Sequence, residues 1–153
     1  MPNSVFQPKD PRFAERVAQS FALQGAMQTL GARLQQVEPG SVDIGFDWAA
    51  ALTQQHGFVH AGMLSTALDS ACGYAAFSLM PPDASVLTIE FKTNLLAPAR
   101  GERFRVEGRV LKLGRTISVC EGRAFAISGG EEKLVATMDC TLMCVQGREG
   151  VSG

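Results

Sequence analysis

The chain has 153 residues, 46% hydrophobic and 19% charged, so it is long enough and apolar enough to bury the core of one globular domain. Its net charge of −1 offers no general attraction to nucleic acid or to an anionic membrane, so any binding of anions must be local. The N-terminus lacks the basic, apolar and small-residue layout of a secretory signal, so we expect a cytoplasmic protein.

The cysteines do not show the spacing of a metal site. The chain has no CxxC pair, and its only histidines, His56 and His60, lie outside any cysteine-rich segment. We therefore expect no metal, no cofactor, and reduced cysteines that lie mostly in the core. The four are Cys72, Cys120, Cys140 and Cys144.

The N-terminal part of the chain predicts a lead-in followed by two helices. Two prolines within residues 1–10 favour a flexible lead-in. From Pro11 onward the apolar residues recur at helical spacing, and a second short helix over 24–30 is expected to end at Gly31. The apolar side of the first helix comprises Phe13, Val17 and Phe21.

The period then changes to alternation, which predicts a strand with one buried face. A loop is expected at 49–59, followed by a long apolar helix from His60 to about Met80, where Pro81 and Pro82 end it. The residues predicted to form the strand's buried face are Val42, Ile44, Phe46 and Trp48.

Four further segments, at about 86–96, 104–113, 116–127 and 133–145, have β-type patterns. Glycines and a proline at the breaks favour turns, and short connections make consecutive strands antiparallel neighbours. One long helix and about five strands predict an α+β fold with the sheet wrapped around the helix. An exposed edge or outer face of such a sheet favours dimerisation.

Asp69 is the only acidic residue in the apolar stretch 60–79. A charged carboxylate there is costly unless it is paired, hydrogen-bonded or raised in pKa, so Asp69 is the first candidate for a catalytic group. An aspartate that meets solvent or caps a helix is the alternative. The same charge, with Gly73 and several hydroxyl residues, favours a buried helix over a membrane span.

The segment QQHGFVHAGMLSTALD resembles the active-site motif of the PaaI-type hotdog-fold acyl-CoA thioesterases. In that family an Asn or Gln lies six residues before a HGG triplet, and an acidic residue follows the triplet's His by nine. Gln54, His60, Gly62 and Asp69 match this spacing, whereas Ala61 replaces the first glycine of the triplet. The family uses the backbone N–H at that position to polarise the thioester carbonyl, and alanine retains this N–H.

The resemblance implies a hotdog fold, with the core at about 33–145 in a single domain at 11–146 and a flexible tail at 147–153. It implies hydrolysis of an acyl- or aryl-acyl-CoA to free acid and CoA, without metal or cofactor. Nine residues at 100° place Asp69 on the opposite helix face from His60 and roughly 13 Å further along the axis. If both act together they come from different subunits, so we expect a homodimer, assembled further as a dimer of dimers, and no nucleic-acid or membrane partner.

Each candidate residue has a chemical role that its type allows. The N–H groups of Ala61 and Gly62 lie at a helix N-terminus, where unpaired donors suit a developing oxyanion. Asp69 either attacks the carbonyl or deprotonates a water, and the sequence leaves both routes open.

Three further residues are candidates for the catalytic site. Gln54 can donate to the carbonyl or orient the water, and a surface glutamine is its alternative. His60 can hold the loop or support the oxyanion site. Thr88 matches a position where some members of the family carry a hydroxyl that contacts the water or the acidic residue; otherwise it is an ordinary strand threonine.

Substrate-binding candidates are cations near turns and apolar residues near the motif. Guanidinium and ammonium groups suit the phosphates of CoA. Apolar side chains either line an acyl slot or fill the core. The candidates near turns are Lys112 and Arg115 around the glycine of one turn, Gly114, and Arg100 at another turn; the apolar candidates are Met63, Leu64, Tyr74 and Phe77.

Two other functions remain open at this point. A hotdog dehydratase or hydratase also uses an acidic residue on the central helix, but with a differently placed histidine. A non-catalytic hotdog dimer would bind acyl-CoA without turnover. Since fold alone does not determine function, only the site can separate these alternatives.

Overall fold

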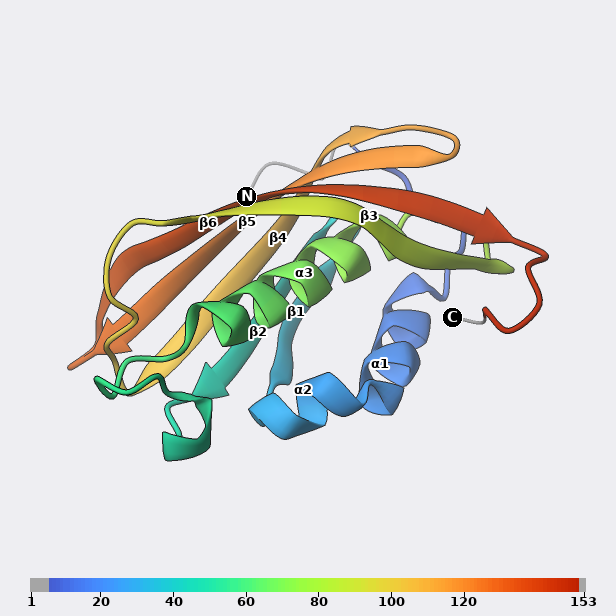
Figure 1. Cartoon of the computed structure of the whole chain (residues 1–153). Coiled ribbons are helices and arrows are strands. Elements are labelled where there is room, and N and C mark those ends of the chain that lie inside the picture. The colour runs from blue at the N-terminus through green and yellow to red at the C-terminus, as the bar shows by residue number, and fades with distance from the viewer. Residues whose placement is uncertain (1–5, 152–153) are drawn as a thin grey trace.

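The computed structural model describes residues 6–151, and the expectations for residues 1–5 and 152–153 lie outside this range. Figure 1 shows one curved antiparallel sheet with α3 along its concave side and α1 and α2 on the same side. The helices are α1 Phe13–Leu23, α2 Gly25–Leu30, the short 3-10 helix η1 Ala50–Leu52 and α3 Ala61–Phe77. The strands are β1 Arg33–Glu38, β2 Ser41–Asp47, β3 Ala84–Leu95, β4 Arg103–Leu113, β5 Ile117–Ser128 and β6 Glu131–Gln146.

The strands are arranged in the order β1-β2-β4-β5-β6-β3, so β1 and β3 form the two edges. All neighbouring pairs are antiparallel, which confirms the predicted α+β hotdog architecture. No helix in residues 6–151 is long and apolar enough to cross a membrane.

The sheet has one strand more than the sequence pattern predicted. β1 was missed because a register shift between Leu34 and Gln36 interrupts its alternation. Its only large apolar residues, Leu34 and Val37, are three apart and partly buried. A bulged edge strand of this kind does not produce a period-2 signal.

The helix α3 ends at Phe77, three residues earlier than predicted. Ser78 explains the early end, because its hydroxyl donates to the carbonyl of Ala75 at 2.7 Å and accepts from the backbone N–H of Gly40 at 2.8 Å. The second bond ties the chain to the β1–β2 turn. The predicted loop at 49–59 likewise contains one turn of helix, η1.

The prediction for β2 was correct for one face and wrong for the other. Val42, Ile44 and Phe46 are buried as expected, but Asp43 is also only 8% exposed. Arg109 pairs with it at 2.7 Å and Arg105 at 3.4 Å, so the two arginines cover its carboxylate on the outer face. Trp48 lies beyond the end of the strand and is 44% exposed, contrary to its predicted place on the buried face.

The predicted lead-in is packed against the domain where it approaches α1. Asp10 is buried, accepts from the backbone N–H of Arg12 at 2.9 Å and pairs with Arg16 at 3.0 Å. The backbone N–H of Arg12 is the main cause that lowers the pKa of Asp10. Phe6 is partly buried against the core.

Gly108 allows α3 to lie directly on β4. A Cβ at this position would overlap the carbonyl of Ala71 in the middle of α3. We expect Gly108→Ala to lower the free energy of unfolding by about 3 kcal/mol, because backbone on both sides cannot yield without shifting the helix. Urea denaturation measures this loss. Gly25→Ala is the matched control, since nothing lies within 4 Å of its position; equal stabilities would contradict the packing argument.

Candidate active site

Asp69 lies on α3 facing β3, and one oxygen of its carboxylate is held. The Thr88 hydroxyl donates to Oδ1 at 2.7 Å, and the Cys140 thiol donates to the same oxygen at 3.8 Å. Oδ2 has no hydrogen-bond partner within residues 6–151. The half-buried carboxylate is thus oriented by two donors, and its second oxygen is left for chemistry.

Two cavities meet at Asp69. One has a volume of about 550 Å³ and runs along α3 past Gly73 to Phe77, and the other has about 480 Å³ and extends toward Gly62. Both are lined by Gln24, Ser70 and Asp69. A reacting group can therefore approach the free oxygen from either side.

Gln24 joins the N-terminal helices to α3 beside the carboxylate. Its Oε1 accepts from the hydroxyl of Ser70 at 2.6 Å, and its Nε2 donates to the hydroxyl of Tyr74 at 3.3 Å. Ser20 shares a further hydrogen bond with Tyr74 at 3.1 Å, and burial raises the pKa of that phenol. The sequence carried no signal for Gln24, because its contact with Ser70 spans 46 residues.

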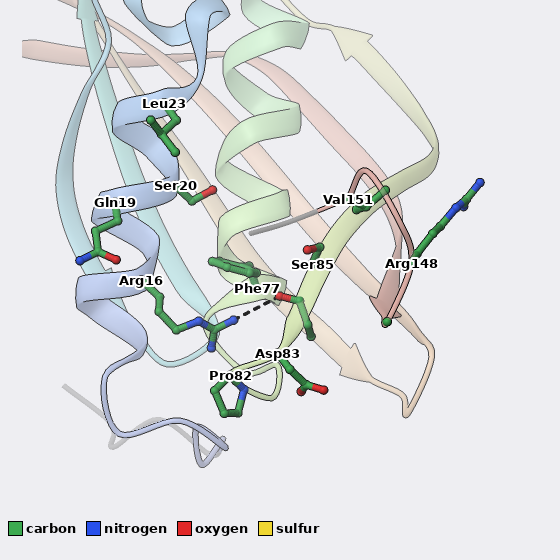
Figure 2. Close-up of a pocket in the computed structure, with 12 residues that line it drawn as sticks. Arg16, Gln19, Ser20, Leu23, Phe77, Pro82, Asp83, Ser85, Arg148 and Val151 are labelled. Atoms are coloured by element: carbon green, nitrogen blue, oxygen red, sulfur yellow. Dashed lines mark hydrogen bonds between the residues drawn. The ribbon is translucent and has the colours of Figure 1, made fainter.

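A third cavity, of about 470 Å³, continues from the first between α1 and the start of β3 (Figure 2). Arg16 reaches across it and donates to the carbonyl of Ala84 at 3.4 Å, whereas Arg148 points away (Figure 2). Arg16 also pairs with Asp10 and lies 4.5 Å from the centre of the Phe77 ring. Its charge is already paired within the protein, so the role of Arg16 is to stabilise the fold.

Three buried thiols lie beneath Asp69. Cys120 and Cys140 face each other across β5 and β6, and Cys72 contributes a third sulfur from α3. A hydrogen bond with Cys140, followed by burial, raises the pKa of Cys72 well above its ordinary value, and burial raises the pKa of Cys120 to about 12. Both of these thiols are therefore protonated at neutral pH. The sequence predicts that the cysteines lie in the core, but no local pattern connects Cys140 to Asp69.

The N-terminus of α3 differs from the expectation in one respect. The His60 side chain accepts from the backbone N–H of Gly62 at 2.8 Å through Nδ1, so it caps the helix and occupies one of the two amides predicted for the oxyanion. The N–H of Ala61 has no acceptor in the described part of the chain. Ala61 is thus the available donor, and His60 has a supporting role in the loop.

Gln54 and Ala61 line a separate cavity of about 410 Å³ with Leu64 and Leu95. The side-chain oxygen of Gln54 accepts from the backbone N–H of His56, which leaves its amide N–H groups for a ligand. The eight residues from Ala61 to Asp69 correspond to about 12 Å along the helix axis. Within one chain, Asp69 therefore lies beside Thr88, and Gln54 shares a cavity with Ala61. The first pair and the second pair are not brought together.

The candidate cations fall into two groups at opposite ends of β4, a strand of 11 residues and about 35 Å. Lys112, Gly114 and Arg115 lie at the β4–β5 turn, while Arg100 precedes the strand. A Cβ at Gly114 would overlap the carbonyl of Ile117, so this glycine is needed for the turn itself.

The apolar candidates are divided between core and cavity. Leu64 is 1% exposed and packs in the core, where it also reaches the Gln54 cavity, whereas Met63 is half-buried. Tyr74 and Phe77 are buried and line the cavity that runs from Asp69.

Comparison with known proteins gives a consistent result. The sequence pattern of the thioesterase superfamily matches residues 56–133. A solved thioesterase family protein from Silicibacter pomeroyi is 55% identical, with 88% of this chain and 99% of that chain covered and a TM-score of 0.87. An archaeal protein from Halobacterium salinarum, provisionally named an esterase, is 30% identical over 102 residues, which are 63% of this chain and 67% of that protein.

The PaaI protein of Escherichia coli, from the phenylacetic acid degradation operon, shares the fold with a TM-score of 0.79 at 16% identity, covering 89% of this chain and 95% of that one. These matches confirm the resemblance found in the motif around Asp69. The chain belongs to the thioesterase superfamily and is a thioester hydrolase with the hotdog fold of the PaaI type.

Proposed function

We propose that the protein is an acyl-CoA thioesterase that hydrolyses acyl- or aryl-acyl-CoA at a site shared between two subunits of a homodimer in the cytoplasm. The observation that best supports this proposal is the geometry of the Asp69 carboxylate. Its Oδ1 is held by Thr88, and its Oδ2 is free between two cavities. A group with these properties on a helix that has no other charged residue is suited to act as base or nucleophile.

The edge strand β3 supports the dimer. Within residues 6–151 its only neighbouring strand is β6, so its other side presents backbone groups that no described strand pairs with. Several of its large apolar side chains are also exposed, between 39% and 57%, which favours burial against a second copy. These residues are Leu87, Ile89, Phe91 and Leu95.

The register of this pairing follows from the positions of the two half-sites along β3. Asp69 accepts a hydrogen bond from Thr88, and Leu95 lines the cavity that also contains Gln54 and Ala61. Antiparallel pairing about Lys92, with the bulge between Thr88 and Glu90 counted as one position, would place Thr88 opposite the partner's Leu95. Asp69 of one subunit then faces the free N–H of Ala61 in the other, and each dimer has two equivalent sites.

The chemistry follows from this arrangement. The Ala61 N–H at the positive end of α3 and the Gln54 amide polarise the thioester carbonyl and stabilise the oxyanion. Asp69 Oδ2 takes a proton from water as it attacks, or attacks itself to form an anhydride that water then cleaves. The CoA thiolate leaves and takes up a proton, and the acyl group is released as the acid.

A dimer of dimers is part of the same proposal. Exposed apolar residues on the outer face of the sheet offer a surface for a second dimer, and Leu87 connects this face to the β3 edge. The others are Leu111, Ile117 and Val119.

The direct test is release of free thiol from short, medium, long and aromatic acyl-CoAs. Turnover of saturated or aromatic thioesters supports the proposal, and the panel identifies the acyl class. Hydration of an enoyl-CoA with saturated thioesters left intact would instead favour a hydratase. Tight binding of acyl-CoA without turnover would favour a binding protein.

Thr88→Val is expected to lower kcat about tenfold, because the isosteric side chain cannot donate to Asp69 Oδ1 and one hydrogen bond to a charged group is lost. Thr88→Ser retains the donor and is the matched control. The measurement is steady-state thiol release with both variants. Equal kcat for the valine and serine variants would show that the hydroxyl does not orient the carboxylate.

A further inference from the structure

After β6 the chain turns back over the domain. The end of the strand is fixed, because Nε2 of Gln146 donates to the carboxylate of Asp83 at 2.9 Å. Gly147 and Gly150 then have φ of 64° and 77°, the left-handed region that glycine adopts without the strain of a Cβ. These turns direct residues 147–151 away from the line of β6 and into the space between α1 and β3 (Figure 1). We call this segment the strap.

The strap lies at the boundary between two cavities. The inner cavity, of about 550 Å³, runs from Asp69 along α3 to Phe77, and the outer cavity, of about 470 Å³, lies between α1 and the start of β3. Val151 lines both of them and is partly buried, whereas residues 147–150 are exposed. In the outer cavity it lies on the β3 side, across from α1 (Figure 2). Val151 is therefore placed where one cavity meets the other.

Few contacts hold the strap in this position. Among residues 6–151 its one hydrogen bond is internal, from the backbone N–H of Val151 to the carbonyl of Arg148 at 3.3 Å. Neither Arg148 nor Glu149 forms an ion pair with a described residue, and Arg148 points away from the outer cavity (Figure 2). A segment with an exposed backbone and few tertiary contacts opens at low cost in free energy. The strap can therefore open while β6 stays paired.

The inner cavity suits the acyl group of the substrate. It begins at the Asp69 carboxylate and is lined by the buried rings of Tyr74 and Phe77. The helix rises about 12 Å from Asp69 to Phe77. A short acyl chain therefore ends before it reaches Val151, whereas a longer one has to pass this side chain and enter the outer cavity.

We propose that the strap sets the length of acyl chain that the enzyme accepts. When the strap is closed, Val151 ends the inner cavity; when it is open, the inner and outer cavities are continuous. The inference rests on the proposed function and specifies its acyl preference. A long acyl chain binds only the open form, so its apparent affinity falls with the fraction of protein that is open. A short chain fits both forms and does not depend on the strap.

The first test favours the open form. A Gly147→Ala, Gly150→Ala double variant strains both turns of the closed strap, and nothing lies within 4 Å of either position to add a clash. Its kcat/KM on palmitoyl-CoA should rise at least about tenfold, with no change on butyryl-CoA. The matched control is Gly129→Ala, Gly130→Ala, because these glycines have φ of 57° and 82°, equally open surroundings and a place in the β5–β6 turn.

The second test makes the opposite change. Val151→Trp fills the junction of the two cavities and should lower kcat/KM on octanoyl-CoA at least about tenfold, again with butyryl-CoA unchanged. Glu149→Trp is its control, because Glu149 is exposed and lines neither cavity. The same length profile in wild type and both test variants, or an equal change in the controls, would overturn the inference.

Calorimetric titration with free laurate and butyrate gives a readout that needs no turnover. The double glycine variant should bind laurate more tightly than wild type does and should bind butyrate equally. If this difference appears but no thioester is hydrolysed, the strap is supported and the proposed function alone fails. If thioesters are hydrolysed with one length profile in every variant and laurate binding does not change, the strap is excluded and the thioesterase remains.

Discussion

Asp69→Asn is expected to lower the rate of thioester hydrolysis at least about 100-fold while the protein stays folded. The amide has nearly the same shape, and its oxygen can still accept from Thr88, so the surrounding geometry is kept. It can neither take a proton from water nor form an anhydride. The loss should therefore appear in kcat with little change in KM.

The control for this variant is Asp139→Asn. Asp139 is exposed on β6, one residue before Cys140, and the same substitution there should leave both kcat and stability unchanged. Circular dichroism and thermal unfolding of both variants establish that the fold is intact. A folded Asp69→Asn enzyme that keeps more than a tenth of the wild-type rate would exclude Asp69 as base or nucleophile.

Ile89→Glu is expected to convert the dimer into monomers and to lower activity at least about 100-fold, because each site then lacks the Ala61 N–H of the second subunit. Ile89 is 52% exposed on β3 and lines none of the cavities around Asp69. A carboxylate at this edge would have to be desolvated on pairing. Light scattering coupled to size exclusion measures the mass, and thiol release measures the rate.

Leu23→Glu is the matched control, because Leu23 is an 81% exposed leucine on the helix α1 and not on the edge strand β3. It should remain dimeric and active. A monomeric Ile89→Glu protein with full activity would mean that one subunit contains a complete site.

Mixing two inactive variants tests the shared site directly. Ala61→Pro removes the free N–H at the first position of α3, where proline is tolerated, and His60 already has the extended φ of −61° and ψ of 139° that precede a proline. Random mixing with Asp69→Asn makes half of the dimers mixed, each with one intact site. About a quarter of the wild-type activity should return. No recovery on confirmed subunit exchange would place both residues in the same site of one chain.

Much of the fold was predictable because it depends on local patterns. The helical period of α1, the apolar run of α3 and the alternation along β4 to β6 are properties of consecutive residues. Asp69 was recognisable for the same reason, since it is a single charge in an apolar segment. The motif spacing led from there to Gln54, His60 and Ala61, and the family comparison confirmed the class of protein.

The features that were missed depend on contacts between distant residues. Asp43 appears solvent-facing in sequence, yet it is buried because Arg105 and Arg109 from β4 cover it. Gln24 bonds Ser70 from 46 positions away and Cys140 bonds Asp69 from 71 positions away, and no local pattern marks either residue. The same holds for Phe58, Arg100 and Lys133, which meet only because the segment before α3, the β3–β4 connection and the start of β6 line one cavity.

The sequence by itself determined the α+β class, the central helix and the candidate carboxylate, because hydrophobic period and charge placement act over a few turns of chain. Tertiary structure alone decided three other features. It determines which oxygen of Asp69 is free, and it leaves β3 as an open edge of the sheet. It also determines that the backbone N–H of Gly62 has an acceptor, whereas the N–H of Ala61 has none among the described residues. These outcomes depend on strand order and on which side chains meet across the sheet. Packing of the whole chain sets both, and no segment specifies them alone.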